Sequence, residues 1–193
     1  MTEHRDKSGE TAIIAVITVS DRSARGERAD VSGPRATEIL RDAGYETTAS
    51  LVPDGENNVA TAISAAIADG AHAVITSGGT GIGPRDLTPE GTRPLITTEL
   101  PGIAEELRRH GASNNRMSVL SRGLAGIATS ESVAAIVGGA QGAPVAPGKP
   151  NPPGVLVVNL PGSVKAVEEG LEVLLPLLPH ILEQLRGGDH ESV

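Results

Sequence analysis

Apolar and β-branched residues gather in short runs that recur along the chain. Such runs predict buried strands, because a strand covered on both faces has no polar side to alternate with. We predict strands at residues 11–19, 46–52, 72–76, 132–137 and 155–160. The stretches between them carry apolar residues at the three- and four-residue spacing of one helix face. We predict helices at residues 32–43, 57–68, 101–110, 117–124 and 163–185.

Proline and glycine mark several ends of these predicted helices. Pro34 lies in the first turn of the segment 32–43, where the missing N–H would have no helical partner, and Gly44 follows as the stop. Pro176 and Pro179 fall inside the segment 163–185, and we expect them to kink or break that helix.

The alternation of strands and helices predicts the fold class. Parallel strands joined by helices form a sheet covered on both faces, so we expect a single doubly wound α/β domain with a mostly parallel sheet. The domain should occupy residues 11–186, with flexible tails at 1–10 and 187–193. The segment 141–153 is rich in proline and glycine, and an exposed insertion is favoured there over a lid on an active site.

Amino-acid composition limits the residue types that can build the core and the kinds of partner that the protein can be expected to bind. The chain has no Trp, no Phe and a single Tyr, so its core must be built from Ala, Val, Ile and Leu, which suits helices packed on a parallel sheet. The formal net charge is −8 and the basic residues form no stripe, so no nucleic-acid partner is expected. An acidic protein that binds an anion must concentrate positive potential locally, in loops, helix N-termini or a bound metal ion.

The absence of cysteine excludes disulfides, thiolate metal sites and cysteine nucleophiles. The apolar run 12–19 is too short to cross a bilayer, and the mixed-charge segment before it has no convincing signal-peptide cleavage site. We therefore expect a cytoplasmic protein without membrane contact. The five histidines are scattered, and none pairs at metal-ligand spacing. His110 is interpreted as favourable charge near a helix C-terminus.

The most informative polar segment follows the predicted strand 72–76. It begins with the string SGGTG at residues 77–81 and continues with PRDLTPE at 84–90. Glycine has no Cβ, so several amide N–H groups can converge on one anion, and Thr80 and Thr88 add hydroxyl donors. Asp86 could hold a divalent cation against phosphate oxygens. The segment indicates phosphate binding at the carboxyl end of a strand, although a glycine-rich loop can also serve only as a turn.

Two widespread nucleotide motifs are excluded by spacing. A P-loop requires GxxxxGK followed by Ser or Thr, and the sequence Gly-Lys-Ser or Gly-Lys-Thr does not occur in the chain. The dinucleotide fingerprint GxGxxG, counted from Gly79, would need glycine at the position that Pro84 occupies. A nucleotide site at this loop would belong to another class.

The whole string from residue 77 to residue 90 resembles the signature of the Mog/MoaB family, the molybdopterin adenylyltransferases of molybdenum-cofactor biosynthesis. Further matching segments occur in the family's order, and the resemblance covers residues 12–186. These segments lie at residues 18–22, 30–34, 52–54, 100–102, 120–122 and 159–163.

The resemblance implies a reaction between two bound substrates. The terminal phosphate of molybdopterin would attack the α-phosphate of ATP and pyrophosphate would leave, with Mg²⁺ neutralising the converging anions. No protein nucleophile is required. The resemblance also implies a homotrimer, with possible hand-over of the product to a molybdenum insertase. Two alternatives stay open: a non-catalytic paralogue that binds molybdopterin or a nucleotide, and an interaction scaffold without a ligand.

The resemblance assigns roles to single residues. Asp86 and Asp54 match the family's two carboxylates and are assigned to catalysis and to Mg²⁺. Asp86 could instead cap the helix that follows it, and Asp54 could be only a turn residue. The expected contacts to phosphate and substrate are Asp21, Ser77, Gly78, Gly79, Thr80, Gly81, Thr88, Ser121, Pro161, Gly162 and Ser163.

Several neighbouring residues have simpler interpretations beside the functional one. Asp21 could only cap a turn, and Ser163 could be only the N-cap of the last helix. Arg122 is expected to line the same pocket as Ser121, and Lys165 is a further candidate for a phosphate contact. The basic residues of the segment 22–28 are interpreted as a solvated loop rather than as steering groups for an anionic pterin.

Overall fold

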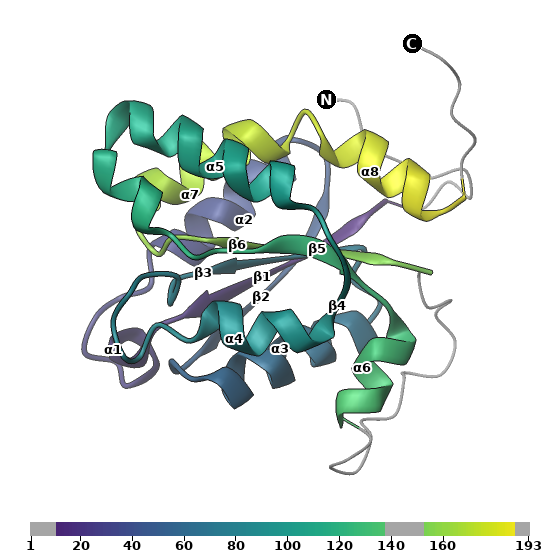
Figure 1. Cartoon of the computed structure of the whole chain (residues 1–193), viewed down its shortest axis with the longest axis horizontal. Coiled ribbons are helices and arrows are strands. Elements are labelled where there is room, and N and C mark those ends of the chain that lie inside the picture. The colour runs from purple at the N-terminus through teal and green to yellow at the C-terminus, as the bar shows by residue number, and fades with distance from the viewer. Residues whose placement is uncertain (1–10, 138–152, 188–193) are drawn as a thin grey trace.

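The computed structural model describes residues 11–137 and 153–187 of the chain (Figure 1). At its centre is one six-stranded sheet with the strand order β2-β1-β3-β6-β5-β4. The first four strands in that order are parallel, and β5 and β4 each run antiparallel to the neighbour before them. The strands are β1 (Ile13–Val19), β2 (Glu46–Val52), β3 (Ala73–Ser77), β4 (Ile96–Glu99), β5 (Ala125–Ala128) and β6 (Val155–Leu160).

Helices cover both faces of the sheet, as Figure 1 shows. One face carries α2 (Ser32–Asp42), α5 (Pro101–Asn114), α7 (Val164–Leu174) and α8 (Leu178–Leu185). The other face carries α3 (Glu56–Ala68), α4 (Thr88–Thr92) and α6 (Ser130–Val137). Three short elements complete the described chain: α1 (Asp21–Ala24) and the 3-10 helices η1 (Arg93–Leu95) and η2 (Arg116–Leu120). The predicted doubly wound α/β domain is confirmed.

The core is aliphatic and lies in two layers, one on each side of the sheet. Every residue of β6 is buried, and successive side chains of a strand point to opposite faces. Leu156 and Val158 accordingly belong to the layer under α7, whereas Val155 and Val157 belong to the layer against α3. The only tyrosine, Tyr45, is buried in the first layer. The composition-based prediction of an Ala, Val, Ile and Leu core is therefore confirmed.

The prediction of a strand at residues 132–137 is wrong, because this segment is the helix α6. Thr129 and Ser132 exchange backbone-to-side-chain hydrogen bonds of 3.0 and 3.1 Å, which satisfies two amides of the first turn. The Ser132 hydroxyl also donates to the carbonyl of Leu95 at 2.8 Å. Capping and this distant contact outweigh the strand preference of a short β-branched run.

The prediction of a helix over residues 117–124 is also wrong, because the helical segment ends at Leu120. Only η2 is helical, and the chain then extends into β5, a strand that the sequence pattern did not predict, like its partner β4. Both strands have four residues and pair with each other. A Cβ on Gly126 would lie 2.5 Å from Cγ2 of Ile96 and 2.7 Å from the carbonyl oxygen of Thr98. The close approach of β4 therefore requires glycine here, and only the tertiary structure reveals it.

Of the remaining predicted helix ends, one agrees with the structure and one does not. The last helix breaks where its prolines predict: α7 ends at Leu174 and α8 begins at Leu178. In contrast, α5 continues to Asn114, so His110 does not lie at a helix end; its Nε2 contacts Oε2 of Glu172 at 3.1 Å. The predictions for residues 1–10, 141–152 and 188–193 lie outside the described residues. No described helix is both long enough and apolar enough to span a membrane.

Candidate functional site

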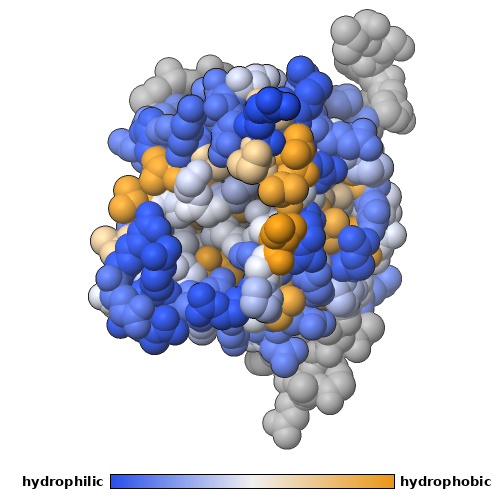
Figure 2. All heavy atoms as spheres, turned by 60° about the vertical axis from the view of Figure 1, so that its left-hand side comes forward, coloured by the Kyte–Doolittle hydropathy of each residue, from blue (hydrophilic) through white to orange (hydrophobic). Residues whose placement is uncertain are grey.

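A large cavity near the predicted site residues lies beyond the carboxyl ends of the parallel strands. Its volume is about 610 Å³, and Figure 2 shows this face with a pale hollow at its centre. Ligands of doubly wound sheets bind at this edge. Most of the predicted site residues line the cavity, although they come from separate loops. They are Asp21, Asp54, Ser77, Gly78, Gly79, Thr80, Gly81, Asp86, Ser121, Pro161, Gly162 and Ser163.

Two glycines of the loop after β3 are required by its close packing. Gly78 and Gly79 have φ angles of 113° and 63°, a backbone region that favours glycine. A Cβ on Gly78 would lie 2.2 Å from the carbonyl oxygen of Val19. The N–H of Gly78 donates to the carbonyl of Leu160 at 2.9 Å, so it is not available to a ligand. In the described part of the chain, the N–H groups of Gly79, Thr80 and Gly81 donate to no protein acceptor, and they remain for a bound anion.

Thr88 supports this loop from beneath instead of facing the cavity. Its side chain is fully buried, and its hydroxyl donates to the carbonyl of Gly78 at 2.8 Å. Its amide donates to the carbonyl of Gly79 at 3.0 Å. Both donors of Thr88 are consumed, which corrects the expectation that its hydroxyl would contact phosphate.

The carboxylate of Asp86 folds back into its own loop. Its Oδ2 accepts a hydrogen bond of 2.9 Å from the amide of Gly83, and a Cβ on Gly81 or Gly83 would lie 2.8 Å from that oxygen. The N-cap residue of α4 is Leu87, without a side-chain cap, so the alternative that Asp86 caps this helix is wrong. Asp86 Oδ1 accepts from no donor of the described chain and is available to a cation or a bound water.

Asp54 and Asp21 hold the ends of β2 and β1 together. The amide of Asp21 donates to Oδ2 of Asp54 at 3.0 Å, and the amide of Asp54 donates to Oδ1 of Asp21 at 3.1 Å. Arg85 donates to the other oxygen of Asp21 at 3.4 Å. Asp54 is therefore more than a turn residue, because its carboxylate joins two strand ends at the cavity wall.

Acidic residues are spread around the cavity instead of clustering. In the part of the chain that the structure describes, no three His, Cys, Asp or Glu side chains form a group that could hold a metal ion. A cation here would take few protein ligands and complete its shell with water and phosphate oxygens. Mg²⁺ is commonly bound in that way, and Asp86 and Asp54 both line the cavity with the carboxylate oxygens that this ion prefers.

Arg122 was expected to line the cavity, but its side chain clamps the glycine-rich loop from behind. Nε donates to the carbonyl of Gly81 at 2.7 Å, and a terminal nitrogen donates to the carbonyl of Asp86. The same guanidinium forms a charge-assisted pair with the carboxylate of Glu90, which lowers the pKa of Glu90. The amide of Arg122 also donates to the carbonyl of Thr80 at 2.8 Å. One residue thus fixes both ends of the loop that carries Asp86.

Two polar side chains beneath the loop behave differently. Asn159 is buried and fully used: its side-chain amide donates to the hydroxyls of Thr76 and Thr92 at 3.0 Å each, and its Oδ1 accepts from the amide of Leu124 at 3.2 Å. Ser77 is equally buried, yet its hydroxyl has no partner among the described residues. A buried hydroxyl without a partner costs free energy unless a ligand or water completes it. Ser77 therefore remains a candidate donor in the cavity wall.

The turn after β6 packs directly on the glycine-rich loop. A Cβ on Gly162 would lie 3.0 Å from Cα of Gly78, so the two backbones approach closely. Ser163 is the N-cap of α7, with its hydroxyl accepting from the amide of Ala166 at 3.2 Å. The cap interpretation of Ser163 is confirmed. Lys165 does not line the cavity and contacts Glu169 at 3.7 Å, so it is no longer a phosphate candidate.

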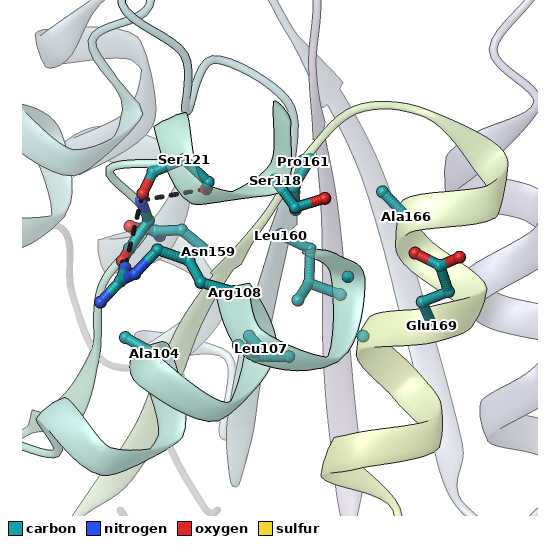
Figure 3. A pocket seen from close by; sticks show the side chains of 13 residues that line it. Ala104, Leu107, Arg108, Ser118, Ser121, Asn159, Leu160, Pro161, Ala166 and Glu169 are labelled. Carbon is teal, nitrogen blue, oxygen red and sulfur yellow. Dashed lines mark hydrogen bonds between the residues drawn. The ribbon is translucent and has the colours of Figure 1, made fainter. Parts of the chain in front are cut away.

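A smaller chamber lies behind Ser121, between α5 and α7 (Figure 3). Its volume is about 30 Å³, which suffices for a water molecule but not for a substrate. On its wall, the guanidinium of Arg108 donates to the carbonyls of Ser121 and Gly123 at 3.4 and 3.2 Å. The hydroxyl of Ser121 in turn meets that of Thr80 at 3.3 Å. The chamber therefore supports the main cavity without extending it.

Basic side chains reach the same cavity from two loops. Arg22, Arg28 and Arg85 line it, and all three are exposed, which agrees with the interpretation of the segment 22–28 as solvated. Arg25 does not line it and pairs with Glu27 at 2.7 Å. Three arginines and the free amides therefore share this edge with the carboxylates of Asp21, Asp30, Asp54 and Asp86.

Comparison with known proteins gives consistent results. A family model described as a probable molybdopterin binding domain matches residues 15–180. A molybdopterin adenylyltransferase from Pyrococcus furiosus is 37% identical, over 95% of this chain and 97% of that protein. A molybdenum cofactor biosynthesis bifunctional protein from Synechococcus elongatus is 41% identical over 92% of this chain. The chain spans only 49% of that bifunctional relative.

Solved structures agree with these relatives. The tungsten cofactor synthesizing protein MoaB from Pyrococcus furiosus superposes with a TM-score of 0.75 at 37% identity, covering 92% of this chain and 98% of that one. A molybdopterin biosynthesis protein from Mycobacterium abscessus superposes with a TM-score of 0.75 at 36% identity, covering 91% and 97%.

Proposed function

The chain belongs to the family of probable molybdopterin-binding domains that includes the Mog and MoaB proteins, and we propose that it is a molybdopterin adenylyltransferase of molybdenum-cofactor biosynthesis. In this reaction a terminal phosphate oxygen of molybdopterin attacks the α-phosphorus of ATP. The bond from that phosphorus to the bridging oxygen breaks, and pyrophosphate leaves with the electron pair. AMP is thereby joined to molybdopterin through a new phosphoanhydride bond.

Positioning of two anions is the main task of such a site, because no covalent protein intermediate is needed. The free amides of Gly79, Thr80 and Gly81 are suited to hold phosphate oxygens. Arg85 and Arg22 supply charge at the cavity wall. Asp86 and Asp54 would hold Mg²⁺, which would neutralise phosphate charge when bound.

One observation carries the proposal. The Asp86 carboxylate is anchored through one oxygen to the amide of Gly83, which leaves the other oxygen available beside unpaired backbone amides. A carboxylate next to an anion cradle repels phosphate unless a cation lies between them. This pairing supports metal-assisted phosphate chemistry rather than a scaffold without a ligand.

The test is incubation of purified protein with molybdopterin, ATP and Mg²⁺, with detection of both adenylylated pterin and pyrophosphate. The Asp86→Asn variant should form little product, whereas the matched Asp69→Asn variant, at the exposed C-terminal end of α3, should behave like the parent. Pterin binding without product in the folded parent protein would replace the enzyme with the non-catalytic binding paralogue.

The family resemblance also supports the proposed oligomeric state, location, partner and ligands. We infer a homotrimer in the cytoplasm that hands adenylylated molybdopterin to a molybdenum insertase. ATP, molybdopterin and Mg²⁺ are its proposed ligands. Each part can be tested separately from the transfer reaction.

A further inference from the structure

Exposed apolar side chains gather at the mouth of the main cavity. Ile82 is 72% exposed and Met117 is 61% exposed, which is unusual for large hydrophobic residues beside a polar site. Leu120 and Val31 are also exposed, and both line the same cavity. Figure 2 shows hydrophobic atoms beside the pale hollow on this face. The cavity thus has a polar floor, and its rim combines these apolar side chains with the exposed arginines Arg22, Arg28 and Arg85.

Hydrogen bonds hold two parts of this rim together. Ile82 follows Gly81, whose carbonyl accepts from Nε of Arg122 at 2.7 Å. Leu120 precedes Ser121, whose hydroxyl lies 3.3 Å from that of Thr80. The end of η2 and the glycine-rich loop are therefore joined side by side, which brings Leu120 and Ile82 to the same wall.

The geometry of η2 explains which of its apolar residues face the cavity. A 3-10 helix has three residues per turn, so side chains three positions apart project on the same side. Met117 and Leu120 have this spacing, and both line the cavity. Val119 is 60% exposed on the same helix but does not line the cavity. Val119 therefore provides a matched control within the same element.

Apolar side chains on the rim above an anion cradle fit a ligand with a phosphate at one end and a flat ring at the other. Rings are often held by aromatic side chains, but this chain has no Phe or Trp, and its single Tyr45 is buried in the core. Aliphatic and thioether groups must then provide the apolar contact. Met is well suited, because its flexible, polarisable side chain makes favourable contacts with ring systems.

We propose that Met117, Leu120 and Ile82 form an aliphatic platform that holds the planar heterocycle of a phosphate-bearing ligand. The inference rests on the proposed function, since adenine in ATP and the pterin in molybdopterin are both such heterocycles. The phosphate lies toward the amides of Gly79 to Gly81, and the ring lies over the platform. The platform therefore gives preference for a ring, whereas the cradle gives affinity for the phosphate.

Paired ligands with and without a ring test this inference by equilibrium binding. AMP is compared with ribose 5-phosphate, and a pterin monophosphate with glycerol 3-phosphate, by calorimetry on the full chain. We expect the parent to bind at least one ring-bearing ligand more tightly than its ring-free partner. Met117→Ala should lower the affinity for that ring-bearing ligand about fivefold, because the thioether side chain that the ring would cover is lost. The affinity for the ring-free partner should not change. Val119→Ala should change neither.

Fluorescence provides a second measurement, because the chain contains no tryptophan. Emission from Met117→Trp should change on addition of the ring-bearing ligand and not of its ring-free partner, whereas emission from Val119→Trp should respond to neither. The ligand pair that responds identifies the ring as nucleobase or pterin. Circular dichroism confirms that each variant is folded.

Several outcomes would overturn the inference. The first is equal affinity of the parent for ring-bearing and ring-free ligands. The second is that none of the four ligands binds. The third is that Met117→Ala lowers the affinity for the ring-bearing ligand and for its ring-free partner by the same factor. An effect of Val119→Ala as large as that of Met117→Ala would also remove it. The binding measurements do not depend on turnover. If the protein prefers ring-bearing ligands but forms no adenylylated pterin, the proposed platform is supported and only the proposed transfer reaction is contradicted.

Discussion

Asp21 and Asp54 exchange two hydrogen bonds, in which the amide of each residue donates to the carboxylate of the other at 3.0 and 3.1 Å. The pair joins the ends of β1 and β2 across 33 positions of the chain. Each carboxylate therefore has a structural task in addition to any contact with a ligand. Substitutions at these positions must separate the lost charge from the lost hydrogen bond.

For Asp54 this separation is direct. Asp54→Asn keeps an acceptor for the amide of Asp21, so its Tm should stay close to that of the parent while Mg²⁺-dependent turnover falls. Asp54→Ala removes the acceptor and should also destabilise the protein by about 1 kcal/mol, a loss of about 2–4 °C in Tm. Thermal unfolding and initial rates of both variants test this prediction. Equal Tm values for all three proteins would show that the exchange does not contribute to stability.

Asp86→Asn should lower turnover without unfolding the protein. The substituted amide oxygen can still accept from Gly83, but the negative charge that would hold Mg²⁺ is lost. Removal of one such interaction costs about 10²–10³-fold in rate. Pterin affinity should change little, because the amides of the loop are retained. Single-turnover rates and pterin titration measure the two effects, and full activity with unchanged Mg²⁺ dependence would place the metal on another group.

Arg122 is a positioning residue, because it touches the loop and not the cavity. Arg122→Lys keeps the charge but cannot reach Gly81, Asp86 and Glu90 together, since only the guanidinium is a planar fork. We expect a loss of about 10–10²-fold in kcat and a higher Mg²⁺ requirement, because the carboxylate of Asp86 is displaced.

A matched variant separates this effect from a general loss of ion pairs. Arg109 also binds a carboxylate through two nitrogens, that of Glu106, but on an exposed face of α5. Arg109→Lys should therefore leave kcat and the Mg²⁺ dependence unchanged. Hydrogen exchange at the amide of Gly83, which donates to the carboxylate of Asp86, should become faster only in Arg122→Lys. Protection equal to that in the parent would contradict the clamp.

The ion pair between Arg122 and Glu90 predicts a pH dependence of stability. Hydrogen bonding to Arg122 lowers the pKa of Glu90 below its ordinary value of 4.5. A carboxyl group with a depressed folded-state pKa contributes stability above its unfolded pKa and loses it as the pH falls through the folded value. Glu90→Gln should therefore be less stable than the parent near neutral pH, and this difference should disappear as the pH falls through the depressed pKa of Glu90. Urea unfolding across this range tests it, and a difference that does not change with pH would contradict it.

Trimer formation is a prediction from the family resemblance alone. Sedimentation velocity at micromolar concentrations should give a single species of three times the 19.6 kDa chain mass. A monomer under these conditions would remove this part of the proposal without affecting the cavity of a single chain.

Local sequence patterns determined the α/β class and most of its elements. The β-branched runs of β1 and β6 identify buried strands, and Pro176 with Pro179 separates α7 from α8, because each effect acts within a few residues. The string from Ser77 to Glu90 also identified the family and the loop that we propose as the phosphate site. These features depend on neighbours in sequence, so a single chain is sufficient to read them.

The tertiary structure alone decided what depends on residues far apart in the chain. Thr88 turns its hydroxyl into the loop, Arg122 clamps it from behind, and Asp54 bonds to Asp21, although each has the sequence appearance of a ligand contact. The strands β4 and β5 have only four residues each, and β5 consists mostly of small residues, so neither has a sequence pattern that predicts a strand. Each is stabilised as a strand by pairing in the sheet. In every case the partner lies ten or more positions away, and the free energy of a contact depends on that partner being present.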